Sequence, residues 1–361
     1  MHRSYTRRWF LSTLSALGAP AYPVIPSEAK RYADPATEFE VLRLTDPQYT
    51  SQLPAYYSRA VSRHLSFLVY TSDRLGSLQA FRMDLKTLES RQIINATVLV
   101  ADSVVLGADE RVVYYADGAS VLMANLSNQR TKTVYESPDE IRALSIADDS
   151  TTAVVVENAK GAWRLRTVRL VGSGPTGAVD SPVPISDAMP RPKRAGVLYR
   201  RGNELWLTTY DGSQNYRLRI APGGLGPAIW SADGRTILYL NFPENPKQLN
   251  NIREFDPDTN EDKLVANTSQ YVHFGRNADA SVFVGASGSK ASPYILLLVR
   301  AVKRELALCE HRSSDATLVA PIFSPNSQRV FFHSDRHGKL AIYSVKVERL
   351  VEETDSEPSK P

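Results

Sequence analysis

The chain has 361 residues, of which 42% are hydrophobic, and its 22 prolines and 19 glycines are scattered, so it can fold around a sizeable core. Its 43 Lys and Arg residues barely exceed its 39 Asp and Glu residues, and no basic stripe with interleaved aromatic residues occurs, so we expect no nucleic-acid partner. The single cysteine, Cys309, excludes an internal disulfide, and the fold therefore depends on its core alone.

The first 21 residues have the composition of an export signal. The paired arginines Arg7 and Arg8 precede an apolar run from Trp9 to Ala19, and a small-residue site follows at residues 19–21. This pattern resembles a twin-arginine signal peptide, and the alternative is a disordered basic tail. The run is shorter than the about 20 residues that span a membrane, and no other segment is long and apolar enough. We therefore expect a periplasmic or extracellular protein without a transmembrane span.

The rest of the chain repeats one pattern seven times, with starts roughly 40 residues apart. Each copy contains a short strand, a polar turn of Asp, Asn, Gly or Ser, a second strand, another turn and a third strand. YTSDRLGSLQAF in the first copy matches FHSDRHGKLAIY in the last. The copies span residues 59–87, 104–126, 144–170, 194–213, 228–259, 272–300 and 320–345.

A fourth, outer strand is expected after each copy, as in ESRQII or EDKLVA. A sheet of four short antiparallel strands cannot bury its faces alone, so the units are expected to stack around an axis. The sequence therefore predicts an all-β fold, a seven-bladed β-propeller of four-stranded antiparallel blades, over residues 36–351. No coiled-coil pattern occurs, so we expect a monomer, and residues 352–361 are expected to form a disordered polar tail.

Two segments outside the repeats are candidates for an additional outer strand. EFEVLRLT, residues 38–45, precedes the first complete copy, and KVERLVEE begins just after Val345. We expect the first segment to help close the ring against the seventh blade.

Two of the six histidines, His333 and His337, fall in the last copy, where the first copy has Thr71 and Leu75. These positions belong to a strand and a hairpin turn away from the central axis. We therefore interpret both as solvated turn histidines without a catalytic role.

The polar turn, followed by a strand and Ser-Asp-Arg-x-Gly, resembles the repeats of TolB-type propellers. The segment EVLRLTDPQYTSQLPAYYSRAVSRHLSFLVYTSDRLGSLQAFRMDLKT and the segments HFGRNADASVFVG and LCEHRSSDATLVAPIFSPNSQRVFFHSDRHGKLAIYS resemble the oligogalacturonate lyase family. That resemblance implies a seven-bladed propeller that cleaves short galacturonate chains by β-elimination during pectin breakdown.

The resemblance also implies a divalent metal ion, typically manganese, held by three histidines and a glutamine. His273 matches one histidine and Asp315 can stand in for the glutamine, whereas Leu318 and Ala320 occupy the other two histidine positions. Residues 226–228 read Gly-Pro-Ala where the family has its histidine base, so no titratable group is present there. The chain therefore keeps the implied manganese site only in part.

β-Elimination also requires that the substrate carboxylate be neutralised, and a guanidinium does this through two parallel hydrogen bonds. Arg59 and Arg312 are candidates for this catalytic role, and Tyr56, Tyr57 and His311 are candidates for substrate contacts at the axis. Alternatively, the arginines are solvated or ion-paired. Two functions stay open: a lyase with a weakened metal site, and a binding module for an acidic oligosaccharide, peptide or partner protein.

A long loop and a Cys-His pair are two further features of the sequence. The loop NFPENPKQLNN, residues 241–251, is longer than the repeat needs, so Asn241, Lys247 and Gln248 are candidates for accessory ligand contacts. Cys309 and His311 share one face of a regular strand, which is compatible with a Cys-His nucleophile or with a buried structural thiol.

Overall fold

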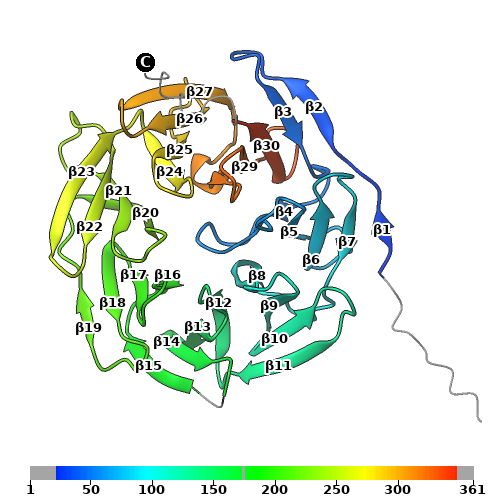
Figure 1. Cartoon of the computed structure of the whole chain (residues 1–361), viewed down its shortest axis with the longest axis vertical. Coiled ribbons are helices and arrows are strands. Elements are labelled where there is room, and N and C mark those ends of the chain that lie inside the picture. The colour runs from blue at the N-terminus through cyan, green and yellow to red at the C-terminus, as the bar shows by residue number, and fades with distance from the viewer. Residues whose placement is uncertain (1–21, 173–174, 348–361) are drawn as a thin grey trace, which may run out of the picture.

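The computed structural model describes residues 22–172 and 175–347. These residues form seven antiparallel sheets around a central axis, with only two short 3-10 turns, Ala101–Ser103 and Ala316–Leu318 (Figure 1). The predicted all-β, seven-bladed propeller is confirmed. The expected signal peptide and the expected polar tail lie outside the described residues. Within the described ranges, no helix is long and apolar enough to cross a membrane.

Blades 1 to 4 contain the following strands, from the innermost outward. Blade 1 has β4 (Ser51–Gln52), β5 (Phe67–Ser72), β6 (Gln79–Asp84), β7 (Ser90–Gln92) and β1 (Val24–Ile25). Blade 2 has β8 (Val105–Leu106), β9 (Val112–Asp117), β10 (Ser120–Asn125) and β11 (Thr131–Glu136). Blade 3 has β12 (Glu140–Ile146), β13 (Thr152–Ala159), β14 (Ala162–Arg169) and β15 (Pro175–Ser181). Blade 4 has β16 (Ile185–Pro190), β17 (Val197–Arg201), β18 (Glu204–Thr208) and β19 (Asn215–Arg217).

Blades 5 to 7 follow the same plan. Blade 5 has β20 (Gly224–Trp230), β21 (Ile237–Phe242), β22 (Asn251–Asp256) and β23 (Glu261–Asn267). Blade 6 has β24 (Tyr271–Arg276), β25 (Val282–Ser287), β26 (Tyr294–Val299) and β27 (Arg304–Glu310). Blade 7 has β28 (Ile322–Phe323), β29 (Arg329–Ser334), β30 (Ala341–Lys346), β3 (Glu40–Arg43) and β2 (Lys30–Ala33).

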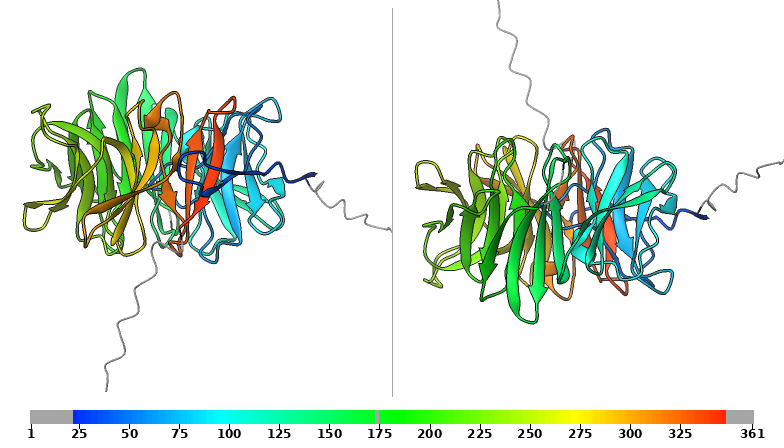
Figure 2. Two further views of the ribbon diagram at one scale, coloured as in Figure 1. Left: turned by 90° about the horizontal axis from the view of Figure 1, so that it is seen from above. Right: turned by 90° about the horizontal axis from the view of Figure 1, so that it is seen from below.

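The hydrophobic core lies between neighbouring blades. The second strand of a blade is covered on both faces, and in β5 all six residues are buried. Between blades 6 and 7, for example, Val284 and Leu297 pack in one cluster with Phe332 and Tyr343. Edge-on, the ring is a disc whose strands run between its two faces (Figure 2).

The polar turn that recurs in the sequence has the same function in several blades. Ser62, Ser231 and Ser324 each accept a hydrogen bond from the backbone N–H five residues later, at 3.0, 2.9 and 2.9 Å. Asn277 does the same through its side-chain oxygen, at 3.0 Å. A short polar side chain here satisfies a backbone donor that the tight turn leaves unpaired, which explains the repeated Ser and Asn.

The ring is closed by the segment that precedes the first repeat, as predicted. β3 pairs with β30, with Leu42 opposite Ser344, so the N-terminal segment completes the C-terminal blade. Two sheets differ from the expected four strands, because β2 extends blade 7 and β1 extends blade 1. The alternative closing segment KVERLVEE lies almost entirely outside the described residues.

Candidate functional site

The innermost strands of the seven blades surround the axis, here called the hub, and they leave one mouth at each end. The first mouth lies where these strands begin and holds a cavity of about 190 Å³ whose lining includes Asp187, Ala320 and His333. The second mouth lies where they end and holds a cavity of about 220 Å³ whose lining includes Asp148 and Trp230.

A loop of blade 1, residues 53–60, enters the hub. Gln52 pairs with Thr71 and Val61 pairs with Leu68, so eight residues of the inner strand face only two residues of β5. The surplus residues cannot pair with β5 and therefore leave the sheet. In Figure 1 this loop extends from β4 toward the middle of the ring. We call residues 53–60 the hub loop.

Tyr56 of the hub loop crosses the hub. Its hydroxyl donates to the carbonyl of Ala228 at 3.0 Å and accepts from the Ala228 N–H at 3.3 Å. Its ring meets the ring of Tyr57 edge to face at 5.0 Å and the imidazole of His273 at 4.9 Å. Burial raises the pKa of both tyrosines well above the usual range, so both stay protonated. Tyr56 thus connects blade 1 with blades 5 and 6.

His273 lies on β24 with its side chain turned into this packed region. The residue is 6% exposed, and its Nδ1 has no hydrogen-bond partner. Burial, with a smaller effect of His333, lowers the pKa of His273 to about 3. The imidazole is therefore uncharged at neutral pH, as a metal ligand must be.

The groups around His273 do not complete a manganese site. Asp315 is exposed, and its carboxylate accepts from the N–H and the hydroxyl of Thr317, at 2.9 and 2.7 Å, as the cap of a short turn. Leu318 and Ala320 line the first mouth and offer no side-chain donor atom. Within residues 22–172 and 175–347, no group of three or more His, Cys, Asp or Glu side chains is placed to hold a metal ion. These residues do not fit the manganese site that the family resemblance implies.

The expectation of a solvated turn histidine is wrong for His333. This residue is only 7% exposed and lines the first mouth. Its Nε2 accepts from the N–H of Leu53 at 2.8 Å, so its Nδ1 carries the proton that is shared with the Leu318 carbonyl at 3.1 Å. The hub loop brings a backbone donor that has no partner in the sheet, and His333 satisfies it. His337, in contrast, is exposed at the turn.

Arg59 and Arg312, the two arginines expected to neutralise a carboxylate, are not brought together. Arg59 lies near the end of the hub loop and lines the second mouth with Arg276. Arg312 is exposed and ion-paired with Glu310, at 2.5 Å from Nε. Arg59 is therefore the one of the two that faces a hub cavity.

His311 and Cys309 are structural in their contacts. His311 is 1% exposed, its Nε2 lies 3.0 Å from the Ser287 carbonyl, and its Nδ1 accepts from the Ser313 N–H at 3.0 Å. Cys309 is fully buried between blades, and burial raises the pKa of its thiol. A thiol that stays protonated is a poor nucleophile, so the buried structural thiol is the interpretation that the structure supports.

The long loop of blade 5 keeps two of its three predicted contact residues accessible. Asn241 is 4% exposed and donates to the Pro222 carbonyl at 3.1 Å. Lys247 and Gln248 are exposed in the β21–β22 connection. Any accessory ligand contact of this loop therefore involves the latter two.

Two carboxylates at the first mouth were not predicted from the sequence as site residues. Asp102 and Asp187 line its cavity, and Asp187 lies 3.7 Å from a guanidinium nitrogen of Arg200. Desolvation raises the pKa of both carboxyl groups, and Arg200 partly opposes the shift at Asp187. Their position in the sequence could have indicated them, because both residues lie near the start of an innermost strand.

No protein-family model matches the chain. An oligogalacturonide lyase of Pectobacterium atrosepticum is 23% identical, with 90% of this chain and 97% of that protein covered. An oligogalacturonate lyase of Dickeya dadantii is 22% identical, with 88% and 95% covered.

Two solved structures share the fold. An oligogalacturonate lyase in complex with manganese has a TM-score of 0.82 at 21% identity and covers 90% of this chain and 98% of its own. An oligogalacturonate lyase from Vibrio parahaemolyticus has a TM-score of 0.80 at 21% identity, with 91% and 98% covered. The chain therefore resembles oligogalacturonate lyases in sequence and in fold, at low identity.

Proposed function

We propose that this chain, which resembles oligogalacturonate lyases along nearly its whole length, binds short uronate oligosaccharides at its hub and does not carry out a metal-dependent elimination. The ligand class is supported by the two curated relatives, whose names state lyase activity on oligogalacturonides and which align over 97% and 95% of their lengths. Export to the periplasm or beyond, suggested by residues 1–21, stays a prediction that cell fractionation would test.

One observation supports the proposal that the chain does not carry out a metal-dependent elimination. Elimination needs a group that neutralises the carboxylate and a base within hydrogen-bond reach of the proton. At the hub, Tyr56 lies against His273 and bonds to Ala228, the positions where the family resemblance implies a metal ligand and the base. A tyrosine held protonated by burial supplies neither a metal ligand nor a base, whereas its ring, which lines the cavity of the first mouth, is suited to pack against a sugar.

A second candidate function is a metal-free elimination at the first mouth. Asp187 has a raised pKa and lies beside Arg200, so the mouth contains a possible general base next to a cation. In that reaction the carboxylate of Asp187 would take the proton next to the substrate carboxylate, and Arg200 would stabilise the resulting negative charge. The carbon–carbon double bond would then form as the glycosidic C–O bond breaks, and the leaving oxygen would take a proton from solvent.

Calorimetry and ultraviolet absorbance separate these functions. The full chain is titrated with digalacturonate and trigalacturonate, with manganese or with a chelator, and with galactobiose as the neutral control. We expect binding of the acidic sugars alone, unchanged by the chelator, and no absorbance from an unsaturated product.

Each other result has a defined meaning. Absorbance that requires manganese contradicts the proposal. Absorbance that persists with the chelator and disappears in Asp187→Asn establishes the second candidate function. If neither digalacturonate nor trigalacturonate binds, the proposal that the ligand is a short uronate oligosaccharide is wrong.

A further inference from the structure

We propose that the second mouth contains a carboxylate-binding subsite formed by Ser58, Arg59, Trp230 and Arg276. All four residues line the cavity of about 220 Å³ at the end of the hub opposite to His273. The subsite is inferred from its own hydrogen-bond donors and charges. Only the identity of the bound sugar acid rests on the proposed function.

The first argument is a set of donors without partners. In the described part of the chain, eight buried side-chain nitrogen or oxygen atoms have no hydrogen-bond partner. Three of them, Ser58 Oγ, Arg59 Nη1 and Trp230 Nε1, belong to residues that line this one cavity. Buried polar atoms in folded proteins are nearly always satisfied by protein or by ordered water, so three unpaired atoms around one cavity are a reason to look for a ligand there.

The second argument is charge. Arg59 and Arg276 both line the cavity, and neither forms an ion pair among the described residues. Arg276 is oriented by three backbone carbonyls, those of Trp230 at 2.9 Å, Asn277 at 3.0 Å and Ala278 at 3.1 Å. Burial lowers the pKa of both guanidinium groups, so a bound anion would offset their desolvation.

The lining favours a monoanion on an organic body. Asp148 is the acidic residue of the cavity wall, so two arginines and one carboxylate leave a net charge of +1. A monoanionic carboxylate neutralises this charge and matches the paired geometry of guanidinium donors, whereas a dianion such as phosphate leaves one negative charge uncompensated beside Asp148. Apolar residues such as Leu106 and Met189 line the same cavity and can pack against the ligand's carbon skeleton.

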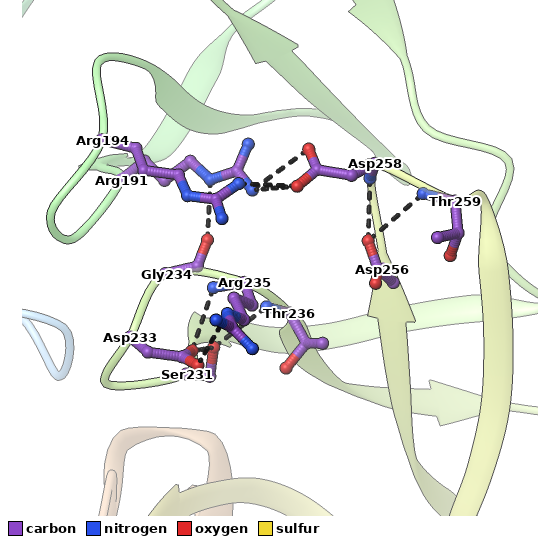
Figure 3. Close-up of polar contacts among 10 residues, drawn as sticks. All are labelled: Arg191, Arg194, Ser231, Asp233, Gly234, Arg235, Thr236, Asp256, Asp258 and Thr259. Carbon is purple, nitrogen blue, oxygen red and sulfur yellow. Dashed lines mark hydrogen bonds and ion pairs between the residues drawn. The ribbon is translucent and has the colours of Figure 1, made fainter.

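The wall that holds Trp230 is fixed by Arg191. The Arg191 guanidinium lies over the indole ring at 5.0 Å and donates to the Gly234 carbonyl at 2.7 Å. It also pairs with Asp258 at 3.2 Å, and Arg194 binds the same carboxylate at 2.6 Å (Figure 3). Arg191 is therefore a positioning residue, which limits the entropy lost when the indole N–H binds a ligand.

The test is calorimetric titration of the full chain with galacturonate, acetate, galactose and inorganic phosphate. We expect galacturonate to bind, acetate to compete with it, and galactose and phosphate to show no binding. Arg59→Met and Arg276→Gln should each weaken galacturonate binding on the order of tenfold, the effect of losing one charge-assisted contact. Trp230→Phe, which keeps a ring but lacks the N–H, should weaken it severalfold.

Two matched variants sharpen the result. Asp148→Asn should tighten binding severalfold, because it removes the opposing charge. Arg235→Gln removes one arginine that is 73% exposed on the neighbouring turn, and it should leave binding unchanged. Circular dichroism and thermal unfolding show whether Arg276→Gln still folds; if it does not, Arg59→Met and Asp148→Asn decide.

The outcomes separate the subsite from the proposed function. If no carboxylate binds, or if the changes at Arg59, Trp230 and Asp148 leave binding unchanged, the cavity holds only water and the proposed subsite is wrong. Oligogalacturonate binding that survives every one of these variants leaves the proposed function intact without the subsite. If acetate binds in a way that depends on Arg59 but galacturonate does not bind, the subsite is supported and its assignment to a sugar acid is wrong. Equal binding of phosphate overturns the preference for a carboxylate.

Discussion

His273 and His333 show how a residue's environment changes its chemistry. Each imidazole is buried at the hub, and burial lowers the pKa from 6.5 to about 3 for His273 and to about 4 for His333. A charged imidazole in this packed region would lack both solvent and an acidic partner. Both residues therefore act as neutral groups that stabilise the hub by packing and, for His333, by hydrogen bonding.

This burial predicts acid sensitivity. As the pH falls below 6.5, the unfolded chain binds protons at these imidazoles while the folded chain does not. The free energy of unfolding therefore decreases from pH 7 toward pH 4. Above pH 7 both states hold neutral imidazoles, and this loss of stability does not occur. We expect a loss of about 2 kcal/mol per imidazole between pH 7 and pH 5, measured by urea unfolding.

Two variants test the origin of this pH dependence. His273→Asn should show a shallower dependence than the unmodified chain, because one buried titrating group is removed. His64→Asn, at an exposed position, should keep the full dependence. Identical pH profiles for all three proteins would show that the buried imidazole does not contribute.

The hub loop is the element of blade 1 that extends into the hub. It inserts residues 53–60 between two points of one inner strand and contacts blades 5, 6 and 7 through Tyr56 and Leu53. Because these contacts join residues of four blades, the loop stabilises the hub and separates the two mouths.

Tyr56 provides the test of this element. Tyr56→Phe should lower the free energy of unfolding by about 1 kcal/mol, because it removes the hydroxyl shared with Ala228. Tyr56→Ala should lower it by about 3 to 5 kcal/mol, because it leaves a cavity at the hub. Urea unfolding measures both, with the matched changes at the 42% exposed Tyr216 as controls. Equal losses at the two positions would contradict the role given to the hub loop.

At the scale of the whole molecule, the ring is closed by a strand from the opposite end of the chain. β3 lies beside β30, and Val41 is fully buried in the cluster between blades 6 and 7. β3 covers the outer edge of β30, and because it belongs to the N-terminal segment it couples the unfolding of the first and last blades.

Closure predicts a large effect at one buried position. Val41→Asp places a charge in the core and should lower the free energy of unfolding by more than about 3 kcal/mol. Thermal unfolding measures the loss, and size-exclusion chromatography detects aggregation of opened rings. Glu40→Gln, at a side chain that is 59% exposed, should change stability by less than about 0.5 kcal/mol. A mild effect at Val41 would mean that β3 is dispensable for closure.

The number of blades and the closing strand could be predicted from the sequence. The reason is that both depend on local patterns of apolar strand residues and polar turn residues such as Ser231. The same repeat logic failed at His333, because the match to Thr71 carries no information about a loop inserted in another blade.

Only the tertiary structure decided what fills the hub. Tyr56 and Ala228 are 172 residues apart, and no local pattern indicates that they meet. The structure likewise assigned Arg59 to the second mouth, beside Arg276 and Trp230, and Arg312 to an exposed ion pair. Strand formation depends on neighbours in the chain, whereas the hub depends on how seven blades converge, and that convergence determines which side chains share a cavity.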